Sequence, residues 1–148
     1  MTTDQTLLAY VVRLYGGGRV VIPPDELRDE AAAFIGSSPI RIYAEEWTLN
    51  QMLKLTEESV TFCVKHGLPV MYVTEDTTRA TPEVIRKLYT TAIECGAKRI
   101  TVCDTVGYVT PAGVKALIKF VQQVVKKTGV KVKIDWHGHR DRDLSVIN

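Results

Sequence analysis

From about residue 31 onward, short runs of apolar and β-branched residues alternate with longer amphipathic segments. The short runs cover residues 68–73, 99–103 and 130–134, and they end at Thr74 and Glu75, at Asp104 and at Asp135. The starts of these runs recur about every 30 residues, which is the length of a βαβ repeat. The pattern therefore predicts parallel strands that alternate with helices.

The helices between these strands have sequence signals at both ends. Hydroxyl side chains precede the helical segments, and glycines follow them. The start signals are the capping box of Thr48 with Gln51, Thr81 before Pro82 and Thr110 before Pro111, and the stop signals are Gly67, Gly96 and Gly129. In the last helix, apolar residues at 114, 117, 118, 121, 124 and 125 form one face, which predicts packing on a sheet.

The first thirty residues are a poorly defined N-terminal segment. Two apolar runs, 10–15 and 19–22, flank Gly16 to Gly18 like the strands of a hairpin, and residues 23–33 could form a short helix. The three glycines are not followed by the Lys-Ser or Lys-Thr pair of a phosphate-binding loop. We therefore interpret them as a flexible turn.

Strands and helices that alternate through short loops indicate a mostly parallel sheet with right-handed crossovers. Two architectures have this pattern, an open doubly wound sheet and a (βα) barrel. Both place functional side chains at the carboxyl ends of the strands. The polar residues that follow the predicted strands are therefore the candidates for chemistry.

Composition narrows the class of protein. The chain has 148 residues, 45% apolar and 24% charged, with a formal charge of +2, which is typical of one globular domain. It has no basic face that would favour nucleic acid, and no lysine-rich amphipathic stretch that would favour a membrane surface. Three cysteines without a CxxC pair indicate reduced thiols. Without a signal peptide or an apolar run of about 18 residues, we expect a cytoplasmic protein.

His137 and His139 are two residues apart at the end of a predicted strand, so their side chains should share one face. They could bind one cation, with Asp135 or Asp141 orienting an imidazole. A polar loop with satisfied histidines is the alternative. His66 lies at a helix end, where a cation complements the helix dipole, and we assign it no function.

Two further polar sites follow the other strands. Glu75 and Asp76 are adjacent, so at an extended strand end one should face a site while the other caps a helix or pairs, for example with Arg79. A solvated loop is the alternative for this pair. Thr105 follows Asp104 in a turn that contains Gly107, where its hydroxyl could bind a carboxylate or form only a local turn.

Four stretches together resemble 2-isopropylmalate synthase and its relatives, which include homocitrate and citramalate synthases and 3-hydroxy-3-methylglutaryl-CoA lyase. They are FIGSSPIR (34–41), VTEDTTRATPE (73–83), CGAKRITVCDTVGYVTP (95–111) and DWHGHRDRDL (135–144). These enzymes are metal-dependent (βα)8 barrels. The resemblance implies a partial TIM barrel of about four βα units over residues 31–148, a pyruvate-carboxyltransferase-type (HMGL-like) domain.

The resemblance also implies roles for single residues. The metal-binding His-x-His pair of the family matches His137 and His139, its carboxylate-binding threonine matches Thr105, and its catalytic ED-x-x-R glutamate matches Glu75. The implied reaction is a Claisen-type condensation, in which acetyl-CoA loses a methyl proton and the enolate attacks the ketone of a 2-oxo acid. Hydrolysis of the thioester follows. The implied cofactor is a divalent Mg, Mn or Zn ion.

Several family features have no match in this chain. The D-x-x-R-D-G motif of the first strand, with its metal-binding aspartate, has no counterpart in residues 1–33, and Ala32 replaces a histidine that many 2-isopropylmalate synthases have. The strand with the asparagine ligand would follow residue 148. Because a (βα)8 barrel needs about 250 residues, we expect a fragment with little or no synthase activity alone. The alternatives are a non-catalytic partial barrel that forms a homodimer, and an open flavodoxin-like domain that binds a small ligand.

Overall fold

The order of strands and helices agrees with the order that the sequence pattern predicts. The computed structural model describes residues 30–144, so the predicted N-terminal hairpin lies outside this range. Of the possible helix over residues 23–33, only residues 30–33 are described, and residues 31–33 belong to a β-strand instead. The elements are β1 (Ala31–Gly36), α2 (Pro39–Ala44), α3 (Leu49–Lys65), β2 (Val70–Glu75), the 3-10 helix η1 (Thr77–Arg79), α4 (Pro82–Glu94), β3 (Arg99–Asp104), α5 (Pro111–Thr128) and β4 (Lys133–Gly138).

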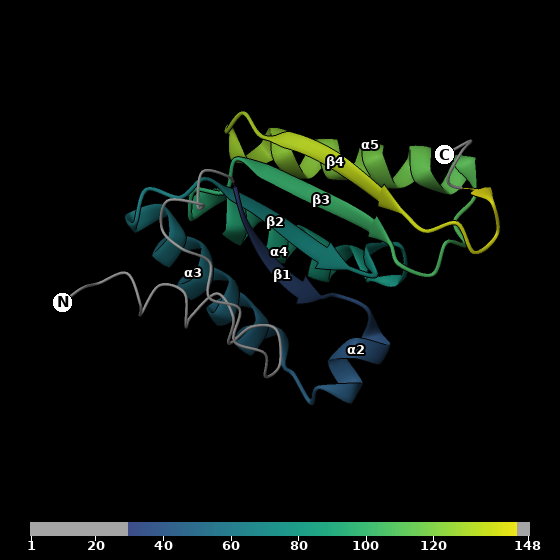
Figure 1. The fold of residues 1–148 in the computed structure, drawn as a ribbon, viewed down its shortest axis with the longest axis horizontal. Coiled ribbons are helices and arrows are strands. Elements are labelled where there is room, and N and C mark those ends of the chain that lie inside the picture. The colour runs from purple at the N-terminus through teal and green to yellow at the C-terminus, as the bar shows by residue number, and fades with distance from the viewer. Residues whose placement is uncertain (1–29, 145–148) are drawn as a thin grey trace.

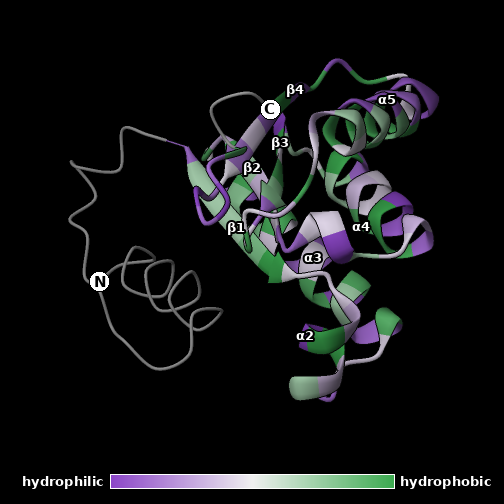
Figure 2. Cartoon of the chain, turned by 90° about the vertical axis from the view of Figure 1, so that its right-hand side faces the viewer, coloured by the Kyte–Doolittle hydropathy of each residue, from purple (hydrophilic) through white to green (hydrophobic). Residues whose placement is uncertain are grey.

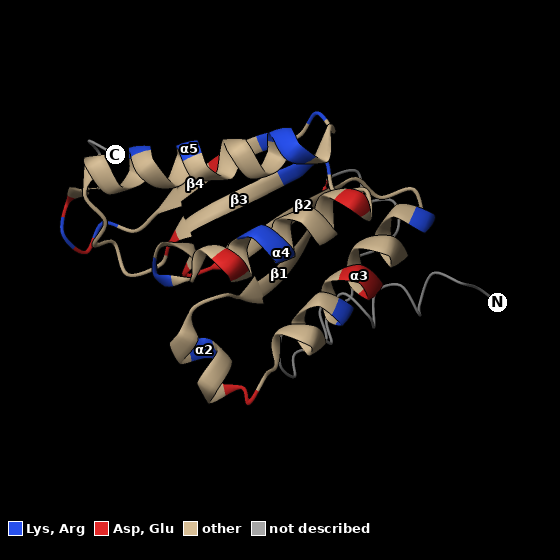
Figure 3. Cartoon of the chain, turned by 180° about the vertical axis from the view of Figure 1, so that it is seen from behind, with Lys and Arg blue, Asp and Glu red and all other residues tan. Residues whose placement is uncertain are grey.

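The four strands form one parallel sheet in the order β1-β2-β3-β4 (Figure 1). The long helices α3, α4 and α5 all cover the same face, as the view from behind shows (Figure 3). A doubly wound sheet would carry helices on both faces, and its strand order would reverse at a switch point. Sequential strands with helices on one side are instead the arrangement of a (βα)8 barrel, so this chain forms part of such a barrel.

The helix boundaries confirm the predicted start and stop signals. Thr48 and Gln51 form a capping box, and the hydroxyls of Thr81 and Thr110 accept hydrogen bonds from the first turns of α4 and α5. Gly129 ends α5 in the left-handed region, at φ +70°. These signals act over a few residues of chain, which is why the sequence alone predicts them.

The core lies between the sheet and its helices, and Figure 2 shows apolar residues in both the strands and the helices. Its largest fully buried side chains include Tyr72, Tyr89, Met52, Leu88 and Ile100. Every second residue of a strand points into this core, and the residues between them point to the opposite face. We call that opposite face the inner face, because it corresponds to the interior of a barrel. No helix in the described range is long and apolar enough to cross a membrane.

Two strands have boundaries that differ from the predicted runs. β2 begins at Val70 and not at residue 68, and β4 covers residues 133–138 where the apolar run suggested 130–134. Pairing with neighbouring strands decides both cases, since Ala31 pairs with Val70 and Arg99 pairs with Lys133. The start of a strand therefore depends on its partner as well as on its own residues.

Candidate active site at the carboxyl ends of the strands

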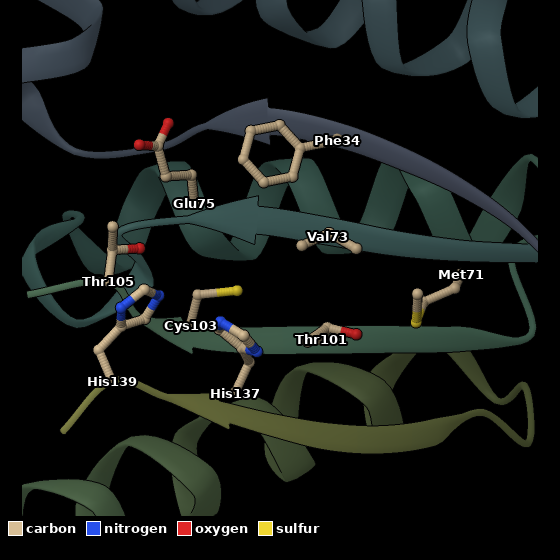
Figure 4. A pocket seen from close by; sticks show the side chains of 9 residues that line it. All are labelled: Phe34, Met71, Val73, Glu75, Thr101, Cys103, Thr105, His137 and His139. Atoms are coloured by element: carbon tan, nitrogen blue, oxygen red, sulfur yellow. The ribbon is translucent and has the colours of Figure 1, made fainter. Parts of the chain in front are cut away.

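A pocket of about 350 Å³ opens on the inner face, at the carboxyl ends of β2, β3 and β4 (Figure 4). It brings together all four predicted site residues, which are Glu75, Thr105, His137 and His139. The other lining residues are Phe34, Met71, Val73, Thr101 and Cys103. Polar chemistry is thus concentrated at the strand ends, and a mostly apolar surface lies deeper along the strands.

The two histidines lie side by side, as their spacing predicts. His137 belongs to β4 and His139 follows it, and their ring centroids are 5.2 Å apart with planes at 73°. The backbone N–H of His139 donates to the carbonyl of Asp104 at 3.1 Å, which joins this segment to the β3–α5 loop. Gly107 in that loop has φ +60°, and a Cβ there would lie 2.7 Å from the His139 carbonyl oxygen. Only glycine allows so close an approach without strain.

Glu75 and Asp76 separate as predicted. Glu75 lines the pocket, and the Nε of Arg41 lies 3.1 Å from its Oε2. Asp76 is only 1% exposed and has φ +59°, and its carboxylate accepts hydrogen bonds from Arg79 Nε at 2.8 Å. Glu75 is therefore available to the pocket, while Asp76 belongs to the β2–α4 turn.

The hydroxyl of Thr105 has a partner from the neighbouring loop and not from its own turn. The backbone N–H of Asp76 donates to Thr105 Oγ1 at 2.8 Å. Because this oxygen acts as an acceptor there, the hydroxyl proton can be donated to a ligand in the pocket. The carboxylate of Asp104 accepts from the Thr78 hydroxyl at 3.2 Å and from the Val109 N–H at 3.1 Å, so Asp104 organises the loop.

Sequence reasoning missed some of the residues that shape this pocket. Arg41 reaches Glu75 by lying across Gly36, where an added Cβ would be 3.0 Å from Arg41 Cβ. Thr101 is 7% exposed, and its hydroxyl has no hydrogen-bond partner among the described residues. Burial raises the pKa of the Cys103 thiol to about 11, and the Glu75 carboxylate adds to the rise. The signal for Thr101 and Cys103 was their strand alternation with the core residues of β3.

Comparison with known proteins identifies the family. Residues 28–148 match the HMGL-like family. The chain belongs to this family. A 2-isopropylmalate synthase from Sulfurisphaera tokodaii is 40% identical over 116 residues, which are 78% of this chain and 29% of the relative. A homocitrate synthase from Methanocaldococcus jannaschii is 32% identical over 122 residues, 81% of this chain and 29% of the relative. The HMGL-like chain thus spans under a third of these relatives.

Solved structures show the same fold. The hydroxymethylglutaryl-CoA lyase from Pseudomonas aeruginosa has a TM-score of 0.67 at 15% identity, and the match covers 82% of this chain and 42% of the lyase. The HMG-CoA lyase from Brucella melitensis has a TM-score of 0.62 at 18% identity and is covered to 41%. At these identities the likeness supports the fold alone. The matched part is somewhat less than half of each lyase chain.

The donor atoms of this HMGL-like chain fit a metal ion only in part. Within residues 30–144, no three His, Cys, Asp or Glu side chains come together closely enough to hold a metal ion. The two imidazoles can supply two ligands, whereas a catalytic zinc site takes three protein ligands and one open position. Asp135, a candidate for orienting a histidine, is instead hydrogen bonded to Arg99 at 2.8 Å. Any complete metal centre needs further ligands from outside the described residues.

Proposed function

We propose that this chain carries part of the active site of an acyltransferase similar to 2-isopropylmalate synthase. The reaction class is the Claisen-type condensation of acetyl-CoA with a 2-oxo acid, and homocitrate or citramalate synthase chemistry differs from it only in the oxo acid. One observation carries the proposal: Glu75, Thr105 and the two histidines, from three neighbouring strand ends, line one pocket. The family match supports the same conclusion.

The pocket suggests a role for each polar group. The Thr105 hydroxyl, whose oxygen already accepts from Asp76, can donate to the carboxylate of the oxo acid. Glu75 is the one acidic side chain among the lining residues, so it is the candidate to accept or hold a proton during condensation. His137 and His139 would provide two ligands for Mg, Mn or Zn. Such an ion, when bound, would polarise the ketone that the enolate attacks.

We expect the chain alone to have little or no synthase activity. Two imidazoles without a carboxylate or amide ligand should bind a divalent ion weakly. The chain also spans only 29% of the synthases it resembles, so most of their length has no counterpart here. The proposed role of this chain is therefore to contribute residues to an active site. A test of that role must provide the remaining residues of the site.

A chimera tests this proposal. Residues 31–144 would replace the matching segment of the synthase from Sulfurisphaera tokodaii, and release of free CoA thiol from acetyl-CoA would be followed with 3-methyl-2-oxobutanoate. We expect turnover by the chimera and none by the chain alone. His137→Ala in the chimera should lower kcat about a hundredfold or more, because a metal ligand is lost. His66→Ala, at the exposed end of α3, is the matched control and should leave turnover unchanged.

A second measurement examines the chain without a fusion. Added Mn²⁺ broadens NMR signals of nearby amides even when binding is weak. We expect broadening around residues 137–139 and 103–105 in the natural chain and in His66→Ala, and none in a His137→Ala/His139→Ala variant. Mn²⁺ broadening that survives loss of both histidines would contradict the proposed role. Turnover by the chain alone would contradict the expectation that this chain is inactive by itself.

A second candidate function is that of a non-catalytic partial barrel that associates with another copy. Both outer strands of the sheet, β1 and β4, have only one neighbouring strand among the described residues. A sheet edge with one neighbouring strand can pair with a strand of another chain.

A further inference from the structure

Arg41 contacts Glu75, the acidic side chain of the pocket, from outside the pocket lining. The Nε of Arg41 lies 3.1 Å from Glu75 Oε2, and both atoms are buried. Neither atom has a hydrogen-bond partner of good geometry among the described residues, so the contact is an ion pair between two atoms that solvent does not reach. Figure 4 shows the Glu75 carboxylate turned toward the segment that follows β1, which carries Arg41. One oxygen of the carboxylate is thus held by Arg41.

The segment from Gly36 to Arg41 fixes both the backbone and the side chain of Glu75. Gly36 pairs with Glu75 across β1 and β2, and a Cβ at Gly36 would lie 3.0 Å from Arg41 Cβ and 3.1 Å from its Nε. The N–H of Ser37 donates to the Glu75 carbonyl at 3.0 Å, and its hydroxyl donates to the same oxygen at 2.7 Å. The small residue at position 36 therefore gives Arg41 the room to reach Glu75.

Arg41 has a second ion pair, which is exposed. Its Nη2 lies 3.1 Å from Oε1 of Glu45, one helical turn further along the chain, and both side chains are 40% exposed. Exposed pairs of this spacing stabilise a protein very little, because water screens them. The buried contact with Glu75 is therefore the one that should affect the pocket, and Glu45 provides a control.

From these contacts we propose that Arg41 is a positioning residue for Glu75, and this inference rests on the proposed function. Arg41 holds Oε2 and so fixes the orientation of the carboxylate. Because Glu75 still lines the pocket, its other oxygen, Oε1, is the one that accepts or holds the proton during condensation. The placement of this oxygen matters, since a displacement of about 1 Å can lower a rate about a hundredfold. Arg41 acts through Glu75, because Arg41 is not among the described residues that line the pocket.

Steady-state kinetics of the chimera test the proposal. Arg41→Met keeps the length of the side chain and removes its charge, so kcat should fall about ten- to a hundredfold. The KM for the oxo acid should stay within about twofold, because the residues that line the pocket are unchanged. Arg41→Lys restores a cation without the planar guanidinium and should recover part of the lost kcat. Glu45→Gln, which removes only the exposed partner of Arg41, is the matched control and should leave kcat and KM unchanged.

Gly36→Ala tests the same contact without changing either charged residue. Gly36 does not have a positive φ, so alanine suits its backbone, but the added Cβ would displace Arg41. We expect Gly36→Ala to lower kcat when Arg41 is present and to have no further effect in an Arg41→Met background. The two substitutions should therefore be non-additive, as expected of residues that act through one contact.

NMR of the full chain examines the contact without any turnover. The Nε–H signal of Arg41, identified by its loss in Arg41→Lys, should exchange slowly with solvent because Nε is buried. We expect Glu75→Gln to shift this signal strongly, since the substitution removes the charge beside Nε. Glu45→Gln should shift it less, because Glu45 contacts Nη2.

Several results would overturn the inference. They are an active chimera whose kcat is unchanged by Arg41→Met, additive losses in the double variant, and an Nε–H signal that does not respond to Glu75→Gln. A rise in KM in place of a fall in kcat would show that Arg41 contacts the substrate directly, which also refutes a positioning role. A chimera without turnover in its natural sequence would instead refute the proposed acyltransferase role, and the NMR comparison would still decide whether Arg41 holds Glu75.

Discussion

Replacing Tyr89 with Phe should measure how much a buried hydrogen-bond network contributes to holding the site. Tyr89 lies on α4 and is 0% exposed, and its hydroxyl is 2.7 Å from Thr74 Oγ1 and donates to the Thr101 carbonyl at 3.2 Å. Thr74 in turn contacts Thr77 Oγ1 at 2.7 Å, which accepts from the N–H of Cys103 at 2.9 Å. The network thus joins α4 to the ends of β2 and β3 beneath the pocket.

The magnitude follows from what the substitution removes. Tyr89→Phe keeps the ring and leaves no cavity, so the loss comes from two hydrogen bonds at about 1 kcal/mol each, a total of about 2 kcal/mol. For a chain of this size, about 3 °C of melting temperature corresponds to each kcal/mol, which predicts a fall of about 6 °C. Urea unfolding followed by circular dichroism would measure the loss in free energy of unfolding. Both proteins should be compared at one fixed protein concentration, because association adds to apparent stability.

The control for this substitution is Tyr43→Phe. The Tyr43 side chain is 85% exposed, so removing its hydroxyl should change the free energy of unfolding by less than about 0.5 kcal/mol. If Tyr89→Phe costs no more than this control, the buried hydroxyl does not stabilise the ends of β2 and β3, and the network would have no role in placing the pocket.

Two further substitutions and a pH series extend these expectations. Burial raises the pKa of Tyr72, of Tyr89 and of Cys103, the last from 9.0 to about 11, so the unfolded chain loses these protons first as pH rises. The free energy of unfolding should therefore be highest below pH 9 and should fall as the pH rises through 9 to 11 and beyond. Cys103→Ala should make this fall less steep, as measured by urea midpoints at each pH. Urea midpoints that do not change with alkaline pH would contradict this reasoning. Gly107→Ala should destabilise by about 1–3 kcal/mol and shift the amide signals of residues 137–139, because its Cβ would meet the His139 carbonyl oxygen at 2.7 Å. Gly67→Ala separates the cost of a positive φ from the cost of the close approach, because Gly67 has φ +75° but a Cβ there meets nothing within 4 Å. Equal losses of stability in both variants would show that the close approach at Gly107 costs nothing.

Features that depend on nearby residues could be predicted from the sequence. The helix starts at Thr48, Thr81 and Thr110 and the alternation of core residues along each strand need only a few positions of chain. The common face of His137 and His139 follows from the same alternation. The opposite directions of adjacent strand residues also predicted that Glu75 and Asp76 separate, and the family resemblance indicated that Glu75 is the one that faces the pocket.

Features that depend on contacts between distant segments could not be predicted. Arg41 and Glu75 are far apart in sequence and meet only because β1 and β2 pair with Gly36 beside Glu75. The acceptor role of Thr105 requires the left-handed backbone of Asp76, which turns an N–H toward the neighbouring loop. The first residue of β4 was also missed, since the pairing of Lys133 with Arg99 sets it. Tertiary pairing decides each of these.

The contacts around the pocket show which property of the site depends on residues outside the described range. Glu75 is held by Arg41, Thr105 by the N–H of Asp76, and the backbone of His139 by the carbonyl of Asp104. All of these contacts lie within residues 30–144, so the four side chains need no other part of a barrel to converge. The set of metal ligands, in contrast, is incomplete within residues 30–144, because no third donor lies near the two histidines in that range. If another segment or chain closes the barrel, it would therefore have to add ligands and enclosure, and the arrangement of Glu75, Thr105, His137 and His139 should change little.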